Sequence, residues 1–307
     1  MSSSIIKLAS SPRITLVGAG TIGLSFAGFH LRHLRAPEDL TILDTRPDLR
    51  EYVKTNLPKY LDASQHHLVS RVNISDSLQD AVKDADIVEE QGPENLPFKE
   101  SIWPKIEEAA PKHALLWSST SGIPASQQSA KMQDKTRLLV VHPYNPPHII
   151  PLLEVVPSPS TSKDVISQTL TFWKARGREP IVMKKECIGF VSNRLAFALL
   201  REGIHLVKEG VLTVEEVDRL VETSMGPRWA VWGPFKSYHA GGGPGGLEGF
   251  FKNIGGTVQG CWDDAGRENV GDGWERDIFC QAQESYGVVD TAQRDEKTRK
   301  ILEITRK

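Results

Sequence analysis

The stretch HPYNPPHIIPLLEVV, from His142 to Val156, places a histidine and a glutamate on either side of a proline-rich break. His142 directly follows the apolar run LLVV, which predicts a strand, and Glu154 lies in the next such run, LLEVV. An imidazole can remove a proton from a hydroxyl group near neutral pH, and a neighbouring carboxylate fixes the ring tautomer and stabilises the imidazolium. We therefore expect His142 to be a general base oriented by Glu154, with the elbow from Pro143 to Pro151 folding the two side chains together. The alternative is a histidine bonded to backbone and an unrelated ion pair of Glu154.

A second group of residues predicts dinucleotide binding. The stretch RITLVGAGTIGLSFAGFHL begins as a strand and ends as a helix, and Gly18, Gly20 and Gly23 form the pattern G-x-G-x-x-G between them. The three glycines allow a tight turn, close approach of the backbone to a pyrophosphate, and packing of the helix on the strand. At the start of the helix, the free amides of Thr21 and Ile22 are expected to bind the phosphates.

The next predicted strand ends in Asp44, about twenty residues beyond the last glycine of the pattern. A carboxylate at this position accepts hydrogen bonds from the ribose hydroxyls and repels a 2′-phosphate, so we expect NAD as the cofactor in preference to NADP. Arg46 complicates this expectation because an arginine can bind a phosphate, although an ion pair with Asp44 is its simpler role. A Rossmann domain that binds no cofactor is the remaining alternative.

Short β-branched runs alternate with helical patterns in the first half of the chain, which is typical of βαβ units and a parallel sheet. From Gly189 onward, apolar residues recur at spacings of three and four, and no later run predicts a convincing strand. We therefore predict an α/β fold, with a Rossmann-type doubly wound NAD-binding domain over residues 1–187 and an all-α substrate-binding and dimerisation domain over residues 188–307. Thr213, followed three residues later by Glu216, predicts a capping box at the start of a later helix. The expected strands cover residues 13–17, 40–43, 87–89, 114–117, 138–141, 152–156 and 180–183, and two expected helices cover residues 95–109 and 162–175.

The composition is that of an ordinary globular protein. Its 307 residues include 37 basic and 39 acidic side chains, so the formal net charge of -2 does not favour nucleic acid as a partner. Cys187, Cys261 and Cys280 lack C-x-x-C spacing, which favours reduced thiols in the cytoplasm over disulfides or a metal site. No apolar run is long enough to span a membrane, the opening MSSSIIKLAS does not have the pattern of a signal peptide, and the final TRK is not a peroxisomal address.

The ordered motifs GAGTIG, DADIVEEQGPEN, SSTSGI, HPYNPP, LLEVV and GFVSNRL, together with Asp44, resemble the 3-hydroxyacyl-CoA dehydrogenase family over essentially the whole chain. Within this family, the chain most resembles the branch that acts on free acids, with its lambda-crystallin/L-gulonate 3-dehydrogenase and L-carnitine dehydrogenase members. The resemblance implies an NAD-dependent oxidation of a 3-hydroxy acid, with His142 as the general base and Glu154 as its orienting carboxylate. It also implies that the helical domain forms a homodimer.

The same resemblance implies further site residues. Ser121 in SSTSGI and Asn193 in SNRL match positions that hydrogen-bond the reacting oxygen and the histidine region, and Glu94, Lys99 and Asn145 match positions that contact the ribose and nicotinamide. The residues themselves leave other roles open. Ser121 can cap the following helix, and Asn193 can be a structural cap or form an interdomain hydrogen bond. Lys99, expected on an exposed helix, is ordinarily a solvated charge.

Two features favour a free acid over an acyl-CoA thioester as the substrate. The segment from Asp44 to Glu90 is shorter than in the acyl-CoA enzymes, whose additional helical arm there holds the CoA, according to the resemblance. The stretch MGPRWAVWGPFKSYHAGGGPGG resembles the free-acid branch, which has an arginine in the place of Arg228. A guanidinium binds a free carboxylate with two hydrogen bonds, although a structural ion pair is the alternative role of Arg228. Trp229 and Trp232 are candidate pocket walls that would attract a quaternary ammonium, although such aromatics are more often core residues.

The sequence therefore predicts an NAD-dependent dehydrogenase of a small free 3-hydroxy carboxylic acid that resembles L-gulonate or L-carnitine. The alternative enzyme is a short-chain 3-hydroxyacyl-CoA dehydrogenase. The alternative of another class is a crystallin-like structural or NAD-binding protein without turnover.

Overall fold

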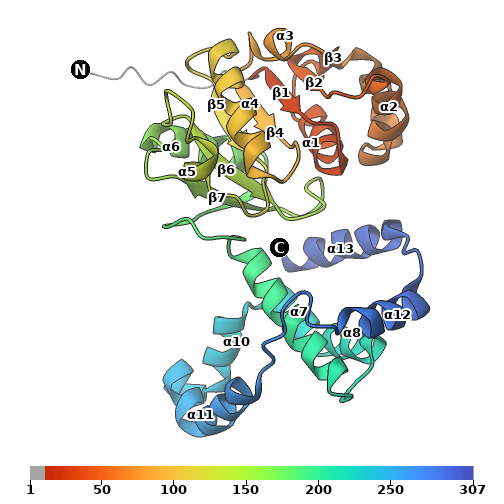
Figure 1. The fold of residues 1–307 in the computed structure, drawn as a ribbon, viewed down its shortest axis with the longest axis vertical. Coiled ribbons are helices and arrows are strands. Elements are labelled where there is room, and N and C mark those ends of the chain that lie inside the picture. Colours follow the sequence, from red (N-terminus) through yellow and green to blue (C-terminus); the bar gives the residue numbers. More distant parts are fainter. Residues whose placement is uncertain (1–10, 307) are drawn as a thin grey trace. The chain divides into compact units, whose positions relative to one another are not determined.

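The computed structural model describes residues 11–306, and the chain divides between Asn193 and Arg194 into two compact units (Figure 1). The first unit is an α/β structure and the second is helical, so the predicted fold class is confirmed. The opening ten residues, in which no targeting signal is expected, and Lys307 of the final TRK lie outside the described residues.

The α/β unit contains one sheet of eight strands among the described residues, in the order β3-β2-β1-β4-β5-β6-β7-β8. The first six strands in this order are parallel, so their carboxyl ends lie along one edge of the sheet. The strands are β1 (Ile14–Val17), β2 (Leu40–Leu43), β3 (Asn73–Ser75), β4 (Ile87–Glu90), β5 (Leu115–Ser118), β6 (Leu138–Pro143), β7 (Leu152–Pro157) and β8 (Glu179–Val182).

The sheet differs from the prediction at two strands. β7 runs antiparallel to β6, because their connection, residues 144–151, is shorter than the dozen or so residues that a parallel crossover needs. β3 was not predicted, because its sequence NIS is short, polar and only partly buried. The other strands agree with the prediction to within one or two residues.

Helices cover both faces of the sheet. Neighbouring residues of each strand point to opposite faces, and the apolar side chains on each face are buried under helices. Ile87 belongs to a hydrophobic cluster with Phe26 of α1 and Trp173 of α6, whereas Val88 belongs to another cluster with Trp103 of α4. Both predicted helices are present as α4 and α6. The helices of this unit are α1 (Thr21–Leu31), α2 (Leu49–Asn56), α3 (Leu78–Val82), α4 (Leu96–Ala109), α5 (Ala125–Gln128) and α6 (Lys163–Lys174), and its 3₁₀ helices are η1 (Pro37–Asp39), η2 (Leu57–Tyr60) and η3 (Ala63–Arg71).

The helical unit begins within α7 (Ser192–Lys208), which crosses the division between the two units. The predicted capping box of Thr213 and Glu216 opens α8, with both of its hydrogen bonds present. Between residues 11 and 306, no helix combines the length and the apolar character needed to cross a bilayer. The remaining helices are α8 (Val214–Thr223), α9 (Met225–Val231), α10 (Pro234–Gly241), η4 (Gly243–Gly245), α11 (Gly246–Asp264), α12 (Glu275–Tyr286) and α13 (Thr291–Thr305).

Candidate active site

His142 and Glu154 are directly opposite each other on the antiparallel strands β6 and β7. Opposed residues of such a pair project to the same face of the sheet, so the register itself brings the two side chains together. Their atoms Nδ1 and Oε2 lie 2.7 Å apart, and the residues are only 6% and 2% exposed. Strand β6 continues through His142 and Pro143, whereas the sequence predicted its end at Val141. The imidazole therefore belongs to a rigid strand at the carboxyl edge of the sheet.

The charge of Glu154 determines which nitrogen of His142 carries the proton. Burial alone would raise the pKa of the Glu154 carboxyl, but hydrogen bonds from His142, Ser192 and the amide of Val191 outweigh it and lower this pKa to about 2. Glu154 is consequently an acceptor only near neutral pH, so Nδ1 of His142 must be the donor in the bond between them. In the neutral imidazole, Nε2 then keeps its lone pair and can accept a proton.

Phe190 packs on the imidazole, although no sequence pattern indicated a role for it. The ring centroids of Phe190 and His142 are 5.4 Å apart, and Phe190 is fully buried. Its backbone has a φ of 51°, which bulky residues rarely adopt, and the preceding Gly189 has a φ of 73°. Two successive left-handed residues make a tight reversal that leads directly into α7. Gly189 in the motif GFVSNRL was the only sequence signal for this turn.

Hydrogen bonds from the first residues of α7 link the predicted catalytic residues to one another. The hydroxyl of Ser192 donates to Oε2 of Glu154, and Nδ2 of Asn193 donates to the carbonyl oxygen of Ser121 at 3.0 Å. Asn193 is thus the second residue of α7. Ser121 does not cap the helix that follows it, because Pro124 occupies the N-cap position of α5.

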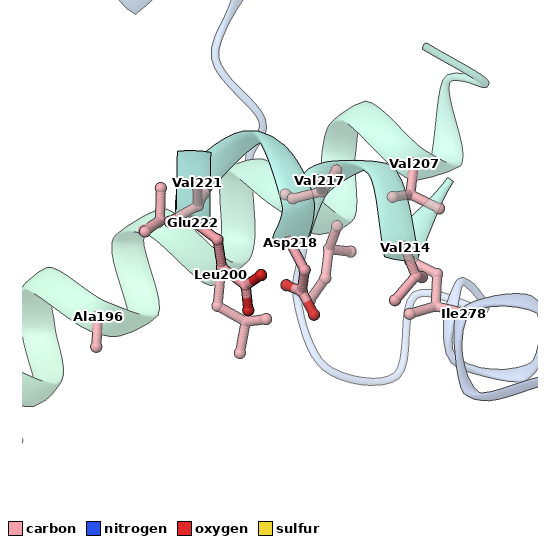
Figure 2. A pocket seen from close by; sticks show the side chains of 12 residues that line it. Ala196, Leu200, Val207, Val214, Val217, Asp218, Val221, Glu222 and Ile278 are labelled. Carbon is pink, nitrogen blue, oxygen red and sulfur yellow. The ribbon is translucent and has the colours of Figure 1, made fainter. Parts of the chain in front are cut away.

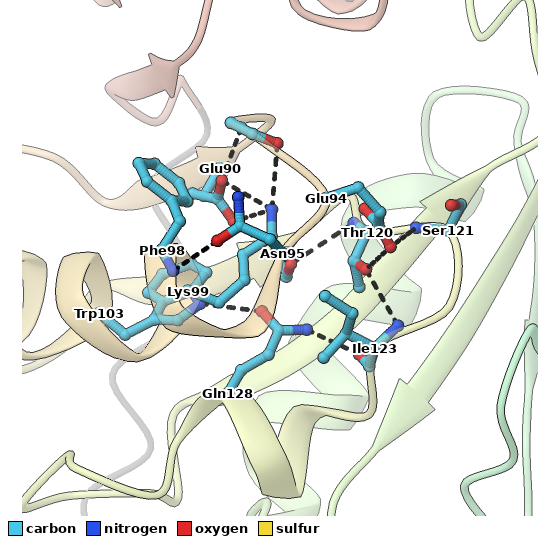
Figure 3. A network of polar contacts seen from close by, with 12 residues as sticks. Glu90, Glu94, Asn95, Phe98, Lys99, Trp103, Thr120, Ser121, Ile123 and Gln128 are labelled. Atoms are coloured by element: carbon cyan, nitrogen blue, oxygen red, sulfur yellow. Dashed lines mark hydrogen bonds and ion pairs between the residues drawn. The ribbon is translucent and has the colours of Figure 1, made fainter.

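Glu94 holds the loop that carries Ser121. Its Oε1 accepts hydrogen bonds from the hydroxyl of Thr120 and from the amides of Ser121 and Gly122 (Figure 3). Thr120 is buried, whereas Glu94 and Ser121 are exposed. The hydroxyl of Ser121 therefore lies on a fixed loop at the carboxyl end of β5.

Lys99 is fully buried in α4, so the expectation of an exposed helix position is wrong. Its Nζ lies 2.8 Å from each carboxylate oxygen of Glu90 and also donates to the carbonyl oxygen of Gly92 (Figure 3). The helical pattern concealed this pairing, because a lysine on an amphipathic helix is usually on the solvent side. The geometry makes Lys99 a support for the end of β4, while Asn145 is exposed in the β6–β7 elbow.

The glycine-rich turn after β1 has the shape needed for a pyrophosphate. Gly18 has a φ of 114°, and a Cβ added to Gly23 would lie 2.0 Å from the carbonyl oxygen of Gly18. No atom lies within 4 Å of a Cβ added to Gly20, so its surface is open. No side chain caps α1, and the first amides of a helix, here those of Thr21 and Ile22, have no intrahelical partners. An uncapped, open helix N-terminus fits an anionic group.

Asp44 lies at the end of β2 beside this turn. Its Oδ2 accepts a hydrogen bond from the amide of Ala19 at 2.7 Å, and its Oδ1 accepts from the amide and Nε of Arg46. Burial opposes ionisation, but these hydrogen bonds outweigh it and lower the pKa of the Asp44 carboxyl. The guanidinium of Arg46 also stacks on the ring of Tyr52, with its central carbon 3.7 Å from the ring centroid. Arg46 is therefore held in place both by the ion pair and by an aromatic ring.

The predicted substrate residues belong to the helical unit. Arg228 is exposed on α9, and its guanidinium has no hydrogen-bond or ion-pair partner among residues 11–306. Trp229 is half-buried and Trp232 is 42% exposed, so Trp232 is not a core residue. The ammonium of Lys236 lies 4.9 Å from the centroid of the Trp232 ring. One cation therefore already lies over that ring.

The helical unit also contains an apolar cavity of about 390 Å³ between α7, α8 and α12 (Figure 2). Leu200, Val217 and Ile278 line it, together with the carboxylates of Asp218 and Glu222. Because like charges repel, these walls do not suit the carboxylate of a substrate. Nowhere in the described part of the chain do three histidine, cysteine or acidic side chains group as a metal site.

Comparisons with known proteins agree with this fold. Residues 13–187 match the family described as "3-hydroxyacyl-CoA dehydrogenase, NAD binding domain", and residues 189–263 match "3-hydroxyacyl-CoA dehydrogenase, C-terminal domain". The L-carnitine dehydrogenase of Streptomyces coelicolor is 34% identical over 256 residues, which cover 81% of this chain and 80% of that protein. The 3-hydroxyacyl-CoA dehydrogenase of Gibberella moniliformis is 35% identical over 265 residues, with 82% and 80% covered.

A solved structure is similar to both units of the chain. It is described as 5-formyl-3-hydroxy-2-methylpyridine 4-carboxylic acid 5-dehydrogenase, an NAD⁺-dependent dismutase. Its TM-score is 0.77 at 26% sequence identity, and the match covers 96% of this chain and 98% of that one.

The geometry around Asp44 generates a prediction about cofactor choice. Asp44→Asn removes the charge that repels a 2′-phosphate and frees Arg46 to bind it. We expect kcat/KM for NADP relative to NAD to rise about 10- to 100-fold, as one charge-assisted hydrogen bond would give. Initial rates at varied NAD and NADP measure this ratio.

Two control variants locate the cause of the change. Arg46→Ala alone should keep the preference for NAD, and Asp44→Asn combined with Arg46→Ala should lose the gain in NADP use. An unchanged cofactor ratio in Asp44→Asn would show that Asp44 does not select the cofactor.

Proposed function

Because this chain belongs to the 3-hydroxyacyl-CoA dehydrogenase family, we propose that it oxidises a small free 3-hydroxy carboxylic acid to the 3-oxo acid, with NAD as the hydride acceptor. The family makes it an NAD-dependent oxidoreductase that acts on a CH–OH group. The observation that carries the proposal is the buried pair of His142 and Glu154, which leaves Nε2 of the imidazole as a proton acceptor. An intact pair of this kind also favours turnover over a purely structural role.

In the proposed reaction, Nε2 of His142 takes the proton of the substrate hydroxyl as its O–H bond breaks. The electron pair of that bond forms the carbonyl, and the carbinol C–H bond breaks. Bound NAD supplies the acceptor for the hydride. Glu154 stays ionised and stabilises the positive charge on His142 through the 2.7 Å hydrogen bond. General-base catalysis of this kind contributes about 10²–10⁴-fold to the rate.

Ser121 and Asn193 are proposed to act on the reacting oxygen. The Glu94 carboxylate fixes the backbone of Ser121, which leaves the Ser121 hydroxyl available to donate a hydrogen bond. Asn193 uses one N–H on the carbonyl of Ser121 and retains a second N–H and an acceptor oxygen. Both groups can thus orient a substrate against His142.

The cofactor is proposed to bind along the carboxyl edge of the sheet, from the Gly18–Gly23 turn and Asp44 toward Glu94 and Asn145. Glu94 and Asn145 are exposed and can contact the ribose and nicotinamide directly. Lys99 is buried in its ion pair, so we propose that it supports the cofactor site through Glu90 and Gly92.

The choice of a free acid is supported by the segment between β2 and β4. Leu49, Val53 and Leu57 of this segment are buried in the core with α1, so they pack on the domain and do not form a separate arm. Arg228 is exposed without a partner among residues 11–306 and can anchor a carboxylate. The relatives named L-carnitine dehydrogenase favour L-carnitine, whereas the cation already over Trp232 favours an uncharged chain such as that of L-gulonate.

A short-chain 3-hydroxyacyl-CoA dehydrogenase is the second candidate. It is favoured by the relative with that name in Gibberella moniliformis, which is as similar to this chain as the L-carnitine dehydrogenases are. The chemistry at His142 is the same for both candidates, so the two differ only in how the carboxyl end of the substrate is bound.

We also propose a homodimer. Leu195, Phe197 and Leu200 project from α7 and are 63%, 59% and 57% exposed. Several large apolar side chains exposed on one helix are typical of a protein interface.

His142→Gln should abolish turnover while sparing NADH binding. The amide keeps a hydrogen-bonding group in place of the ring but cannot take up the substrate proton. We expect kcat to fall at least about 10³-fold, within the range of general-base catalysis, with the Kd for NADH within about twofold of the unchanged protein. The absorbance of NADH measures turnover, and its fluorescence measures binding. Appreciable turnover by this variant would refute His142 as the base.

A substrate panel of L-gulonate, L-carnitine, 3-hydroxybutyrate and 3-hydroxybutyryl-CoA should give NADH formation with a free acid. Arg228→Gln should then lower kcat/KM for that acid about 10- to 100-fold through KM, because one charge-assisted contact is lost. Arg219→Gln removes an exposed arginine of α8 in the same unit and should change neither constant. Turnover of the thioester alone would favour the second candidate.

Light scattering should give a mass twice the 34.0 kDa of one chain. Phe197→Asp introduces a charge into the proposed interface and should shift the mass toward that of a monomer. A monomeric unchanged protein would contradict the proposed homodimer.

A further inference from the structure

We propose that Ser192 is a positioning residue for the reaction, whose hydroxyl fixes the Glu154 carboxylate and through it the His142 imidazole. This inference rests on the proposed role of His142 as the general base. Ser192 belongs to the motif GFVSNRL, but no pattern in the sequence indicated a role for it.

Glu154 accepts hydrogen bonds at both of its oxygens. Oε1 accepts from the amides of Val191 and Ser192, each at 2.9 Å. Oε2 accepts from Nδ1 of His142 at 2.7 Å and from the hydroxyl of Ser192 at 2.6 Å. A carboxylate has about four lone-pair sites, so these donors occupy all of them. The plane of the Glu154 carboxylate is consequently determined from both ends.

The hydroxyl of Ser192 is the contact that shares an oxygen with the base. The two amides fix Oε1, but only the hydroxyl and the imidazole bind Oε2 among the described residues. With the hydroxyl on one lone pair of Oε2, the other lone pair is left to receive Nδ1–H of His142. Glu154 is 2% exposed, so water has little access to replace a lost hydroxyl.

The backbone before α7 places this hydroxyl. The left-handed residues Gly189 and Phe190 reverse the chain, and the next two amides then point at Glu154. These amides stand at the start of a helix of 17 residues, where negative charge is stabilised. Glu154, on strand β7, therefore satisfies the first amides of α7 from outside the helix. The same carboxylate links the start of this helix to the orientation of the base.

The test compares Ser192→Thr with Ser192→Val, two variants of nearly equal shape that differ in the hydroxyl. We expect Ser192→Thr to keep kcat within about threefold of the unchanged protein and Ser192→Val to lose about tenfold, as expected for one hydrogen bond to a charged group. KM for NAD should stay within about twofold in both, because neither variant touches the Gly18–Gly23 turn. If Ser192→Val does not fold, Ser192→Ala replaces it in the comparison with Ser192→Thr.

Ser162→Ala is the matched control. The hydroxyl of Ser162 also lies at a helix start, where it caps α6, but its partner is the amide of Val165. This variant should lower the melting temperature and leave kcat unchanged. A loss of kcat in Ser192→Val together with rescue by Ser192→Thr, at NAD binding equal to that of the control, supports the positioning role.

Two results would overturn the inference in distinguishable ways. Equal kcat values for Ser192→Thr and Ser192→Val would refute the role of the hydroxyl, while an inactive His142→Gln would leave the proposed base intact. Full activity of His142→Gln would refute the base and with it the need to position it.

Discussion

The hydrogen bonds accepted by the buried Glu154 carboxylate are the interaction on which the candidate site depends. The donors come from strand β6, from the reversal at Phe190 and from the start of α7, and each of these segments also shapes the fold. Burial of a charged carboxylate costs free energy unless the carboxylate is well hydrogen-bonded. The buried position of Glu154 therefore depends on these donors. The tautomer of the neutral His142 imidazole follows from this arrangement, since an ionised carboxylate can only accept a hydrogen bond, so Nδ1 must be the donor.

Other carboxylates along the carboxyl edge of the sheet also accept hydrogen bonds from backbone amides. Asp44 binds the amide of Ala19, Glu90 binds the amide of Gly92, and Glu94 binds two amides of the loop after β5. In each case a side chain at or near a strand end holds a neighbouring loop by its backbone. Loops are the most mobile parts of a fold, yet they carry the groups that must meet the cofactor and substrate. Hydrogen bonds donated by loop amides to fixed carboxylates hold these loops in the positions that binding requires.

The sequence predicted the fold and most of the polar positions, because these depend on local patterns. The alternation of strands and helices, the glycine turn and the spacing around His142 are all visible in short windows. The direction of β7 depends on the length of the elbow, whereas the apolar run LLEVV predicts only that a strand is present. The burial of Lys99 and the contacts of Phe190 and Ser192 depend on which distant segments meet, so the helical pattern gave them no distinct signal. The assignment of roles to individual residues in the reaction remains a prediction.

In the antiparallel pair of β6 and β7, the strand ladder keeps His142 opposite Glu154, and the elbow between the strands does not contribute to this pairing. His142 and Glu154 stay opposed as long as the ladder from Leu139–Pro157 to Pro143–Leu153 is kept, so a small change in the number of residues that close the hairpin does not separate them. A slip of one residue in β7, in contrast, would turn the carboxylate to the other face of the sheet. The elbow, in which Tyr144 is exposed, is thus a segment whose length can change during evolution while the proton-transfer pair remains in place, provided that Asn145 keeps its proposed contact with the cofactor.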